Sequence, residues 1–306
     1  MDEFELIEKY FAAADVSADV AIGIGDDGAV LIPTPGQQLV TVVDTLVEAV
    51  HFPAGTDAYD IGYRAVAVNL SDIAAMGARP RWMTLALTLA EANEDWVSEF
   101  SQGLRDAAAP YAVSLVGGDT TSGTSCVVSV QVTGDVPSDG AITRHGARPG
   151  DTIYVSGTIG DAAAGLRLIE SGTPNTALAQ RFLRPTARVS LGLGLRGHAS
   201  AAIDISDGLL GDLKKLLSAS GVGGVVNVDQ VPLSTSLTDA FDTDTARRFA
   251  MLGGDDYELC FTTTNLPEAL ASDVTAIGIV EDTDGLRCKL DGDIVDYDHP
   301  GYTHFS

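Results

Sequence analysis

Apolar residues recur along the chain with two different periods, which predict a mixture of helices and strands. Apolar positions at helical spacing, or alanine-rich runs, predict helices at 4–11, 59–76, 93–109, 161–169, 188–197, 209–219, 244–251 and 267–271. Alternating or β-branched runs predict strands at 29–32, 39–43, 82–89, 112–116, 125–132, 152–156, 201–205, 225–228, 258–262 and 276–280. Helices and strands mix without strict alternation, so each half of the chain is expected to form an α/β sandwich rather than a doubly wound sheet.

The chain has 306 residues, more than one hydrophobic core usually serves, so two domains are expected. A polar, turn-rich stretch at 137–150 is the best candidate for the boundary. We therefore predict an N-terminal domain over 1–138 and a C-terminal domain over 139–306.

Acidic residues outnumber basic ones by 43 to 18, giving a formal net charge of −25. Such a surface repels nucleic acids and anionic membranes, so neither is an expected partner. Two interpretations of the acidity stay open: adaptation to high salt, as in a halophilic archaeon, or a strongly metal-binding surface. The first is favoured because most acidic residues lie outside the motifs described below.

The three cysteines lie far apart, with neither the spacing of a metal site nor an even-numbered disulfide framework. The acidic start of the chain lacks the pattern of a signal peptide, and no apolar run has the length of a membrane span. A soluble, cytoplasmic protein is expected.

Five stretches place an aspartate where an apolar run meets a glycine or another polar turn residue: 25–28, 42–45, 69–72, 117–120 and 203–208. A carboxylate at the end of a buried strand is costly unless a cation meets it. The chain has only four lysines that could do so, Lys9, Lys214, Lys215 and Lys289. The simplest common partner is a divalent metal, and oxygen-only ligands favour magnesium held together with substrate phosphates.

Each of these stretches also has a simpler interpretation. Asp27 could belong to a polar turn, the glycines before Asp119 could form a turn, Asp72 could face solvent, and Ser206 or Asp207 could cap a helix. The recurrence of the pattern favours ligand binding, and Asp204 and Asp207 bracket Ser206 at a helix start, where phosphate is favoured. The stretch 23–28 lacks the third glycine of a dinucleotide-binding loop, and the chain has no P-loop.

No serine–histidine–aspartate or cysteine–histidine arrangement can be argued from the sequence. This absence suits a nucleophile that is already an anion, such as a phosphate oxygen, because that nucleophile needs no general base. A site built mainly from aspartates therefore fits phosphate-to-phosphate transfer. His51 stands apart from the other histidines, although a solitary histidine is more often structural.

In this order, the motifs resemble the thiamine-monophosphate kinase family, which groups with aminoimidazole ribonucleotide synthetase and selenophosphate synthetase. The motifs that carry the resemblance are 23–27 (GIGDD), 44–48 (DTLVE), 67–72 (AVNLSD), 117–121 (GGDTT), 203–209 (IDISDGL) and 256–259 (DYEL). The resemblance implies a two-domain α/β (α+β) fold, with N-terminal domains pairing into a dimeric β-barrel around the ATP sites. It also implies a homodimer that uses ATP and Mg²⁺ to phosphorylate thiamine monophosphate to thiamine diphosphate by in-line transfer.

The same resemblance assigns roles to individual residues. It implies Mg²⁺ ligands at Asp27, Asp44, Asp72, Asp119 and Asp204, and a further ion at Asp207. ATP contacts are implied at Gly118, Asp119, Arg144 and Ser206, and thiamine monophosphate contacts at His51, Asp255 and His299.

The chain departs from the family pattern in three ways: Asp255 replaces a glutamate, Val42 and Val43 replace hydroxyl residues, and His299 replaces an aromatic residue. Two other functions stay open. One is a related enzyme acting on a purine precursor or selenide, although the first cysteine, Cys126, lies far from the N-terminus where selenide chemistry would favour one. The other is a non-catalytic, acidic metal-binding protein.

Overall fold

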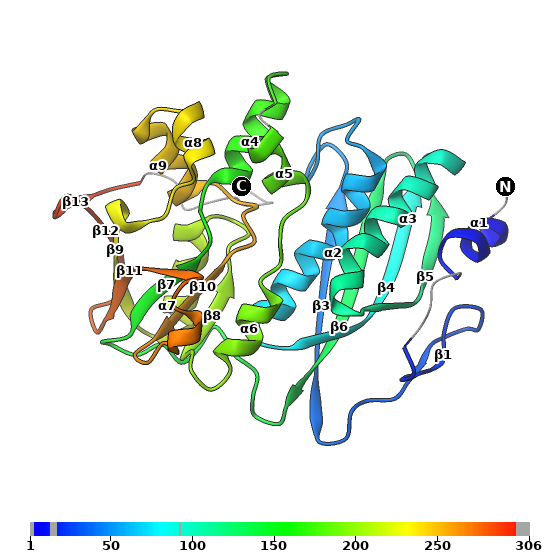
Figure 1. Cartoon of the computed structure of the whole chain (residues 1–306), viewed down its shortest axis with the longest axis horizontal. Helices are drawn as coiled ribbons and strands as arrows, with labels where there is room; N and C mark the ends of the chain where they lie inside the picture. The colour runs from blue at the N-terminus through cyan, green and yellow to red at the C-terminus, as the bar shows by residue number, and fades with distance from the viewer. Residues whose placement is uncertain (1–2, 13–16, 92, 175, 298–306) are drawn as a thin grey trace. The chain divides into compact units, whose positions relative to one another are not determined.

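The computed structural model describes residues 3–12, 17–91, 93–174 and 176–297 (Figure 1). The chain divides into two compact units. Unit 1 comprises Met1–Ile73 and Ala78–Asp139, and unit 2 comprises Ala74–Gly77 and Gly140–Ser306. Each unit packs helices against a mixed β-sheet, so the predicted α/β fold class is confirmed.

Unit 1 is built on a four-stranded sheet with the strand order β3-β6-β4-β5. These strands are β3 (Gln37–Val47), β4 (Arg79–Leu89), β5 (Ser114–Ser122) and β6 (Val127–Pro137). Neighbouring strands are antiparallel except β4 and β5, which run parallel. The remaining elements are α1 (Glu3–Tyr10), β1 (Val20–Ile22), β2 (Val30–Leu31), α2 (Ala58–Ala75), α3 (Glu94–Ala108) and the 3-10 turn η1 (Ala109–Tyr111). Helices α2 and α3 cover one face of the sheet (Figure 1).

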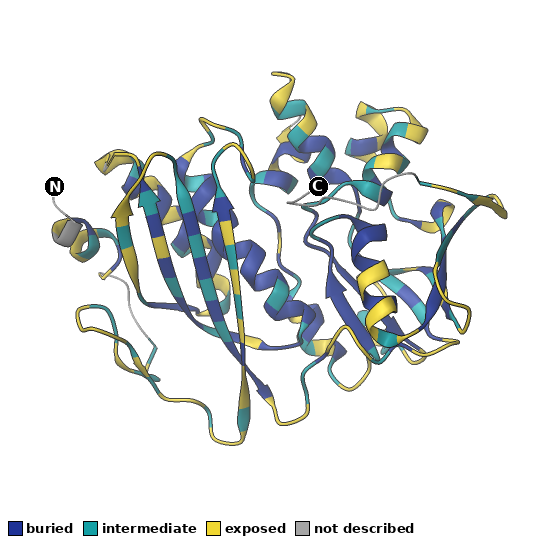
Figure 2. Cartoon of the chain, turned by 180° about the vertical axis from the view of Figure 1, so that it is seen from behind, coloured by how far each residue is buried: buried dark blue, intermediate teal, exposed yellow. Residues whose placement is uncertain are grey.

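The alternation of β6 explains how the two faces of this sheet differ. Val128, Val130 and Val132 are fully buried, whereas the residues between them are only half-buried. Seen from the side away from α2 and α3, exposed and half-buried positions alternate with buried ones along the strands (Figure 2). Hydroxyl groups meet across this face, with Thr45 Oγ1 lying 2.7 Å from Ser129 Oγ.

Unit 2 contains a seven-stranded sheet with the order β13-β12-β9-β11-β7-β10-β8. Its strands are β7 (Thr152–Ser156), β8 (Ala201–Asp204), β9 (Gly223–Asn227), β10 (Leu259–Thr263), β11 (Val274–Glu281), β12 (Leu286–Leu290) and β13 (Asp293–Val295). Its helices are α4 (Asp161–Glu170), α5 (Thr176–Leu183), α6 (Val189–Leu195), α7 (Leu209–Ser220), α8 (Thr235–Ala240) and α9 (Thr243–Leu252), with 3-10 turns η2 (Val228–Gln230) and η3 (Glu268–Leu270). Strands β9 and β12 are the parallel pair. Leu213 and Leu216 of α7 are fully buried in the core that includes Ile153 and Ile203.

The main difference from the sequence prediction concerns β5. The strand was expected to end at Val116, but it continues through the glycine pair to Ser122. Pairing with β4 sustains it, since Met83 lies opposite Leu115 and Thr84 opposite Gly117, which leaves Val116 as an extra bulged residue. Short elements of unit 2 were not predicted, among them α5, α8, β12 and β13, and the predicted helix at 267–271 is a single 3-10 turn.

Two expectations about the whole chain can be checked against the described residues. None of the helices in the described ranges is long and apolar enough to cross a membrane. Cys126, Cys260 and Cys288 all lie in the described part of the chain, and all three are free thiols.

Candidate functional site

A cavity of about 500 Å³ in unit 1 brings together several of the predicted site residues. Asp26 and Asp27 line it from the loop at 23–29, while Gly118 and Asp119 line it from β5. The apolar part of the lining includes Phe11, which follows α1. The cavity therefore gathers three of the predicted residues, and Asp26, for which no role was predicted, lies beside them.

The glycine pair allows β5 to approach β4 closely at this cavity. A Cβ atom on Gly118 would lie 1.9 Å from the carbonyl oxygen of Leu85, whereas one on Gly117 would have no neighbour within 4 Å. Only glycine fits at position 118, because a methyl group there would overlap the β4 backbone. This close approach fixes the position of Asp119, whose register partner on β4 is Ala86.

The carboxylates of this cavity are exposed and have the chemistry of magnesium ligands. Neither Asp27 nor Asp119 makes a side-chain hydrogen bond or ion pair with another described residue, and the described lining contains no lysine or arginine. Exposed carboxylate oxygens are the donors that Mg²⁺ prefers. Among the described residues, however, no group of three or more acidic, histidine or cysteine side chains is arranged to hold a metal ion. The carboxylate donors of this cavity therefore fit Mg²⁺, whereas the full set of metal ligands stays a prediction.

The other predicted residues of unit 1 lie on three different elements. Asp44 is half-buried on β3, opposite Val130 of β6, and Asp72 is half-buried in the last turn of α2. His51 lies in the turn after β3, where its Nδ1 accepts a hydrogen bond of 3.0 Å from the backbone N–H of Val47. In the neutral ring the proton is therefore on Nε2.

In unit 2, the predicted phosphate-binding stretch follows β8 and leads into α7. Asp204 at the end of β8 is buried. Gly208 is the N-cap of α7, and no side chain caps the helix, so the alternative interpretation of Ser206 or Asp207 as a cap is wrong. Instead, Asp212 Oδ2 accepts the backbone N–H groups of Ser206 and Asp207, both at 2.9 Å. An aspartate from the first turn of α7 thus fixes the backbone of the turn.

Lys215 supplies a cation that the sequence analysis did not assign. Its Nζ lies 2.6 Å from Asp207 Oδ2 and 2.7 Å from Asp212 Oδ1. Burial raises the pKa of Asp212, and the contacts with Lys215 offset only part of this effect. Burial by itself would lower the pKa of Lys215, but its hydrogen bonds to Asp207 and Asp212 outweigh burial and raise it. We treat both groups as charged, because Asp212 accepts two backbone N–H groups in addition to the ammonium.

The structure also brings Ser206 and Asp255 together. The backbone N–H of Asp255 donates to the carbonyl oxygen of Ser206 at 2.8 Å, and that of Tyr257 donates to Ile205 at 2.9 Å. A predicted ATP residue and a predicted substrate residue therefore lie on hydrogen-bonded segments. Arg144 is exposed, and its carbonyl oxygen accepts a hydrogen bond from Ser220. His299 lies outside the described residues.

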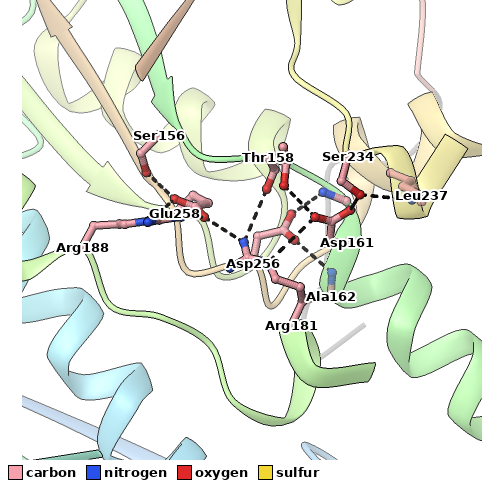
Figure 3. A network of polar contacts seen from close by, with 11 residues as sticks. Ser156, Thr158, Asp161, Ala162, Arg181, Arg188, Ser234, Leu237, Asp256 and Glu258 are labelled. Carbon is pink, nitrogen blue, oxygen red and sulfur yellow. Dashed lines mark hydrogen bonds and ion pairs between the residues drawn. The ribbon is translucent and has the colours of Figure 1, made fainter. Parts of the chain in front are cut away.

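Asp256 and Glu258, which follow Asp255 in the chain, belong to a network of buried polar contacts (Figure 3). Glu258 has no exposed surface and pairs with Arg188 at 2.5 Å and Arg181 at 2.8 Å. Asp256, also fully buried, accepts the backbone N–H groups of Gly160 and Ala162 at 2.6 and 3.1 Å. This role was not predicted, although the two acidic residues Asp256 and Glu258 at the start of an apolar strand were a signal that they needed partners.

The ionisation of Asp256 predicts a pH effect on stability. Burial raises the pKa of its carboxyl to about 7, with Asp161 adding to the effect and the Gly160 and Ala162 amides and Arg181 opposing it. The folded state thus holds this proton more tightly than the unfolded state, and the resulting stability is present below about pH 4 and lost as pH rises through about 7. We expect the unfolding free energy of the wild type, minus that of Asp256→Asn, to fall by up to about 1.4 kcal/mol per pH unit within this window. Urea unfolding of both proteins from pH 5 to 8 measures it, and a constant difference would contradict the assignment.

Comparisons with known proteins cover nearly the whole chain. Residues 25–136 match the AIR synthase related protein, N-terminal domain, and residues 148–290 match the corresponding C-terminal domain. The thiamine-monophosphate kinase of Salmonella typhimurium is 45% identical over 320 residues, covering 99% of this chain and 98% of that protein.

Solved structures agree with these matches. The crystal structure of thiamine-monophosphate kinase from Stenotrophomonas maltophilia superposes with a TM-score of 0.88 at 45% identity, covering 96% of this chain and 98% of the other. A structure described as AaThiL complexed with AMPPCP and TMP superposes with a TM-score of 0.81 at 35% identity, covering 92% of each chain. The chain therefore belongs to the thiamine-monophosphate kinase family, whose two domains are those of the AIR synthase related proteins.

Proposed function

We propose that this protein transfers the γ-phosphoryl group of ATP to thiamine monophosphate and releases ADP and thiamine diphosphate. The observation that carries the proposal is the cavity in unit 1, where the motifs around Asp27 and Asp119 meet in a chain that aligns from end to end with thiamine-monophosphate kinases. The Salmonella relative is named thiamine-monophosphate kinase, and AaThiL is described in complex with AMPPCP and TMP, which supports this pair of substrates.

In this proposal, Asp27 and Asp119 hold Mg²⁺ at the cavity. The family resemblance adds Asp44, Asp72 and Asp204 as Mg²⁺ ligands and assigns a further ion to Asp207. Bound there, Mg²⁺ would neutralise negative charge on the phosphates of ATP and of the acceptor. The chain's own contribution is positioning. Gly118 lets β5 come close to β4 and so fixes Asp119 at the cavity, and the exposed carboxylates present oxygen donors without competing lysines in the described lining.

The acceptor in this reaction needs no general base. A phosphate monoester oxygen is already anionic near neutral pH, so the chain has to align it with the γ-phosphorus rather than remove a proton. We assign ATP contacts to Ser206 and Arg144, and thiamine monophosphate contacts to His51, Asp255 and His299. The backbone hydrogen bond from Asp255 to Ser206 supports these assignments, because it holds a proposed thiamine monophosphate contact beside a proposed ATP contact.

We further propose that the protein is a homodimer formed through the N-terminal domain, residues 1–138, with 139–306 as the C-terminal domain. The face of the unit 1 sheet away from α2 and α3 supports this, since Val43 is 64% and Leu39 50% exposed on β3. Exposed apolar residues that gather on one face favour a protein–protein interface, and a two-fold dimer would bury this same face of both subunits.

The function is tested by incubating the protein with ATP, Mg²⁺ and thiamine monophosphate and separating the products by chromatography. We expect ADP and thiamine diphosphate in equal amounts, and no product when EDTA replaces Mg²⁺, because the phosphate charges would then be unscreened. Unphosphorylated thiamine serves as the control acceptor and should give no product, since it lacks the anionic nucleophile. ATP-dependent phosphorylation of aminoimidazole precursors or selenide instead would favour a related enzyme. Metal binding without any turnover would favour a non-catalytic protein.

A further inference from the structure

The segment between α9 and β10 has a backbone that non-glycine residues rarely adopt. Asp255 has a φ of 71° and Tyr257 a φ of 52°, so two side-chain-bearing residues within three positions lie in the left-handed region. Asp256, between them, points inward and is fully buried. Such a conformation persists only when the surrounding structure holds it in place.

The buried carboxylates on this segment provide that hold (Figure 3). Both oxygens of Asp256 accept backbone N–H groups at the start of α4. Glu258 is bonded by Arg188 through both Nε and Nη2, at 2.6 and 2.5 Å, by Arg181, and by the hydroxyl of Ser156. A carboxylate paired in this way at two guanidinium groups cannot rotate or withdraw without leaving buried charges unpaired.

The held segment is in turn joined to the turn that carries Ser206. Besides the two backbone hydrogen bonds from Asp255 and Tyr257, the chains approach closely at Gly254, where a Cβ atom would lie 2.3 Å from the carbonyl oxygen of Ser206. A movement of 253–257 would therefore either break these bonds or displace the Ser206 turn as well, and in both cases it would disturb the residues assigned to the acceptor and to ATP.

We propose that Asp256 and Glu258 are positioning residues for phosphoryl transfer, which fix Asp255 at the correct place beside Ser206 without touching either substrate. This inference rests on the proposed function, because it needs Asp255 to contact the acceptor. It assigns Arg181 and Arg188 to holding Glu258 rather than to binding phosphate.

The test compares Glu258→Gln and Asp256→Asn with Asp151→Asn in steady-state kinetics of the full-length protein. Asp151 is a matched control, since it is a buried carboxylate of unit 2 that accepts from Arg148 N–H at 2.9 Å and Ser200 Oγ at 2.6 Å, and in the described part of the chain it is not hydrogen-bonded to 253–257. We expect the KM for thiamine monophosphate to rise about tenfold in Glu258→Gln and Asp256→Asn, with a smaller change in kcat. In Asp151→Asn, KM and kcat should stay near the wild-type values, even if its melting temperature falls as far as those of Glu258→Gln and Asp256→Asn.

The outcomes separate the two claims. A wild-type protein that does not phosphorylate thiamine monophosphate refutes the proposed function and this inference with it. If the wild type is active but Glu258→Gln and Asp256→Asn have the same KM for thiamine monophosphate as Asp151→Asn, only the inference is refuted. If Glu258→Gln does not fold, Ser156→Ala replaces it, because it removes the hydroxyl that donates to Glu258 and keeps both arginines; it also removes the acceptor of the Leu259 N–H. The KM should then rise about threefold, and an unchanged KM would overturn the proposal.

Discussion

Replacing Asp119 with asparagine is expected to lower kcat by at least about 10²-fold while leaving the free energy of unfolding nearly unchanged. The carboxylate is exposed and makes no side-chain hydrogen bond or ion pair with another described residue, so the fold does not depend on its charge. The proposed reaction does depend on this charge, because an amide is a much weaker ligand for Mg²⁺ than a carboxylate. Initial rates at saturating ATP and thiamine monophosphate measure the loss, and urea unfolding measures stability.

The control for this variant is Glu99→Gln, which removes one exposed negative charge from α3 of the same unit. Glu99→Gln should keep wild-type turnover. It changes the net charge as Asp119→Asn does, but it removes no proposed metal ligand. Binding of Mn²⁺ as a spectroscopic probe gives a second readout and should weaken only in Asp119→Asn. Equal turnover in the two variants would remove Asp119 from the metal site.

Much of the secondary structure could be predicted, because the spacing of apolar residues within a segment already indicates a helix or a strand. The alanine-rich helix α2 and the alternating strand β4 follow from hydrophobic period alone, and the predicted ranges differ from the observed ones by a few residues. The end of β5 could not be predicted in this way, since a glycine pair normally weakens a strand. Its continuation depends on parallel pairing with β4, which lies 30 or more residues earlier in the chain.

The site shows the same division between local and long-range causes. The motif around Gly118 and Asp119 was visible in the sequence because chemistry requires those residue types side by side. The partner of Asp207 was not predicted, although Lys215 lies only 8 residues away, because only the turn into α7 brings the ammonium back onto it. Glu258 was still less predictable, since Arg188 and Arg181 come from positions 70 and 77 residues earlier.

Changing Gly118 to alanine is expected to destabilise unit 1 by at least about 4 kcal/mol, a range that point substitutions reach only through a specific defect. The defect here is steric, because the new methyl group would lie 1.9 Å from the Leu85 carbonyl oxygen, well inside van der Waals contact. That oxygen belongs to the β4 backbone, so no side-chain rotation relieves the overlap and the two strands must separate. Thermal and urea unfolding measure the loss.

Gly117→Ala is the matched control, since it adds the same methyl group one residue earlier where nothing lies within 4 Å. It should change stability by no more than about 0.5 kcal/mol, the usual range for a substitution without such a defect. Because β5 carries Asp119 to the cavity, Gly118→Ala should also abolish turnover at temperatures where some protein stays folded, whereas Gly117→Ala should retain it. If both variants were equally stable, the close approach of β5 to β4, and with it the placement of Asp119, would be wrong.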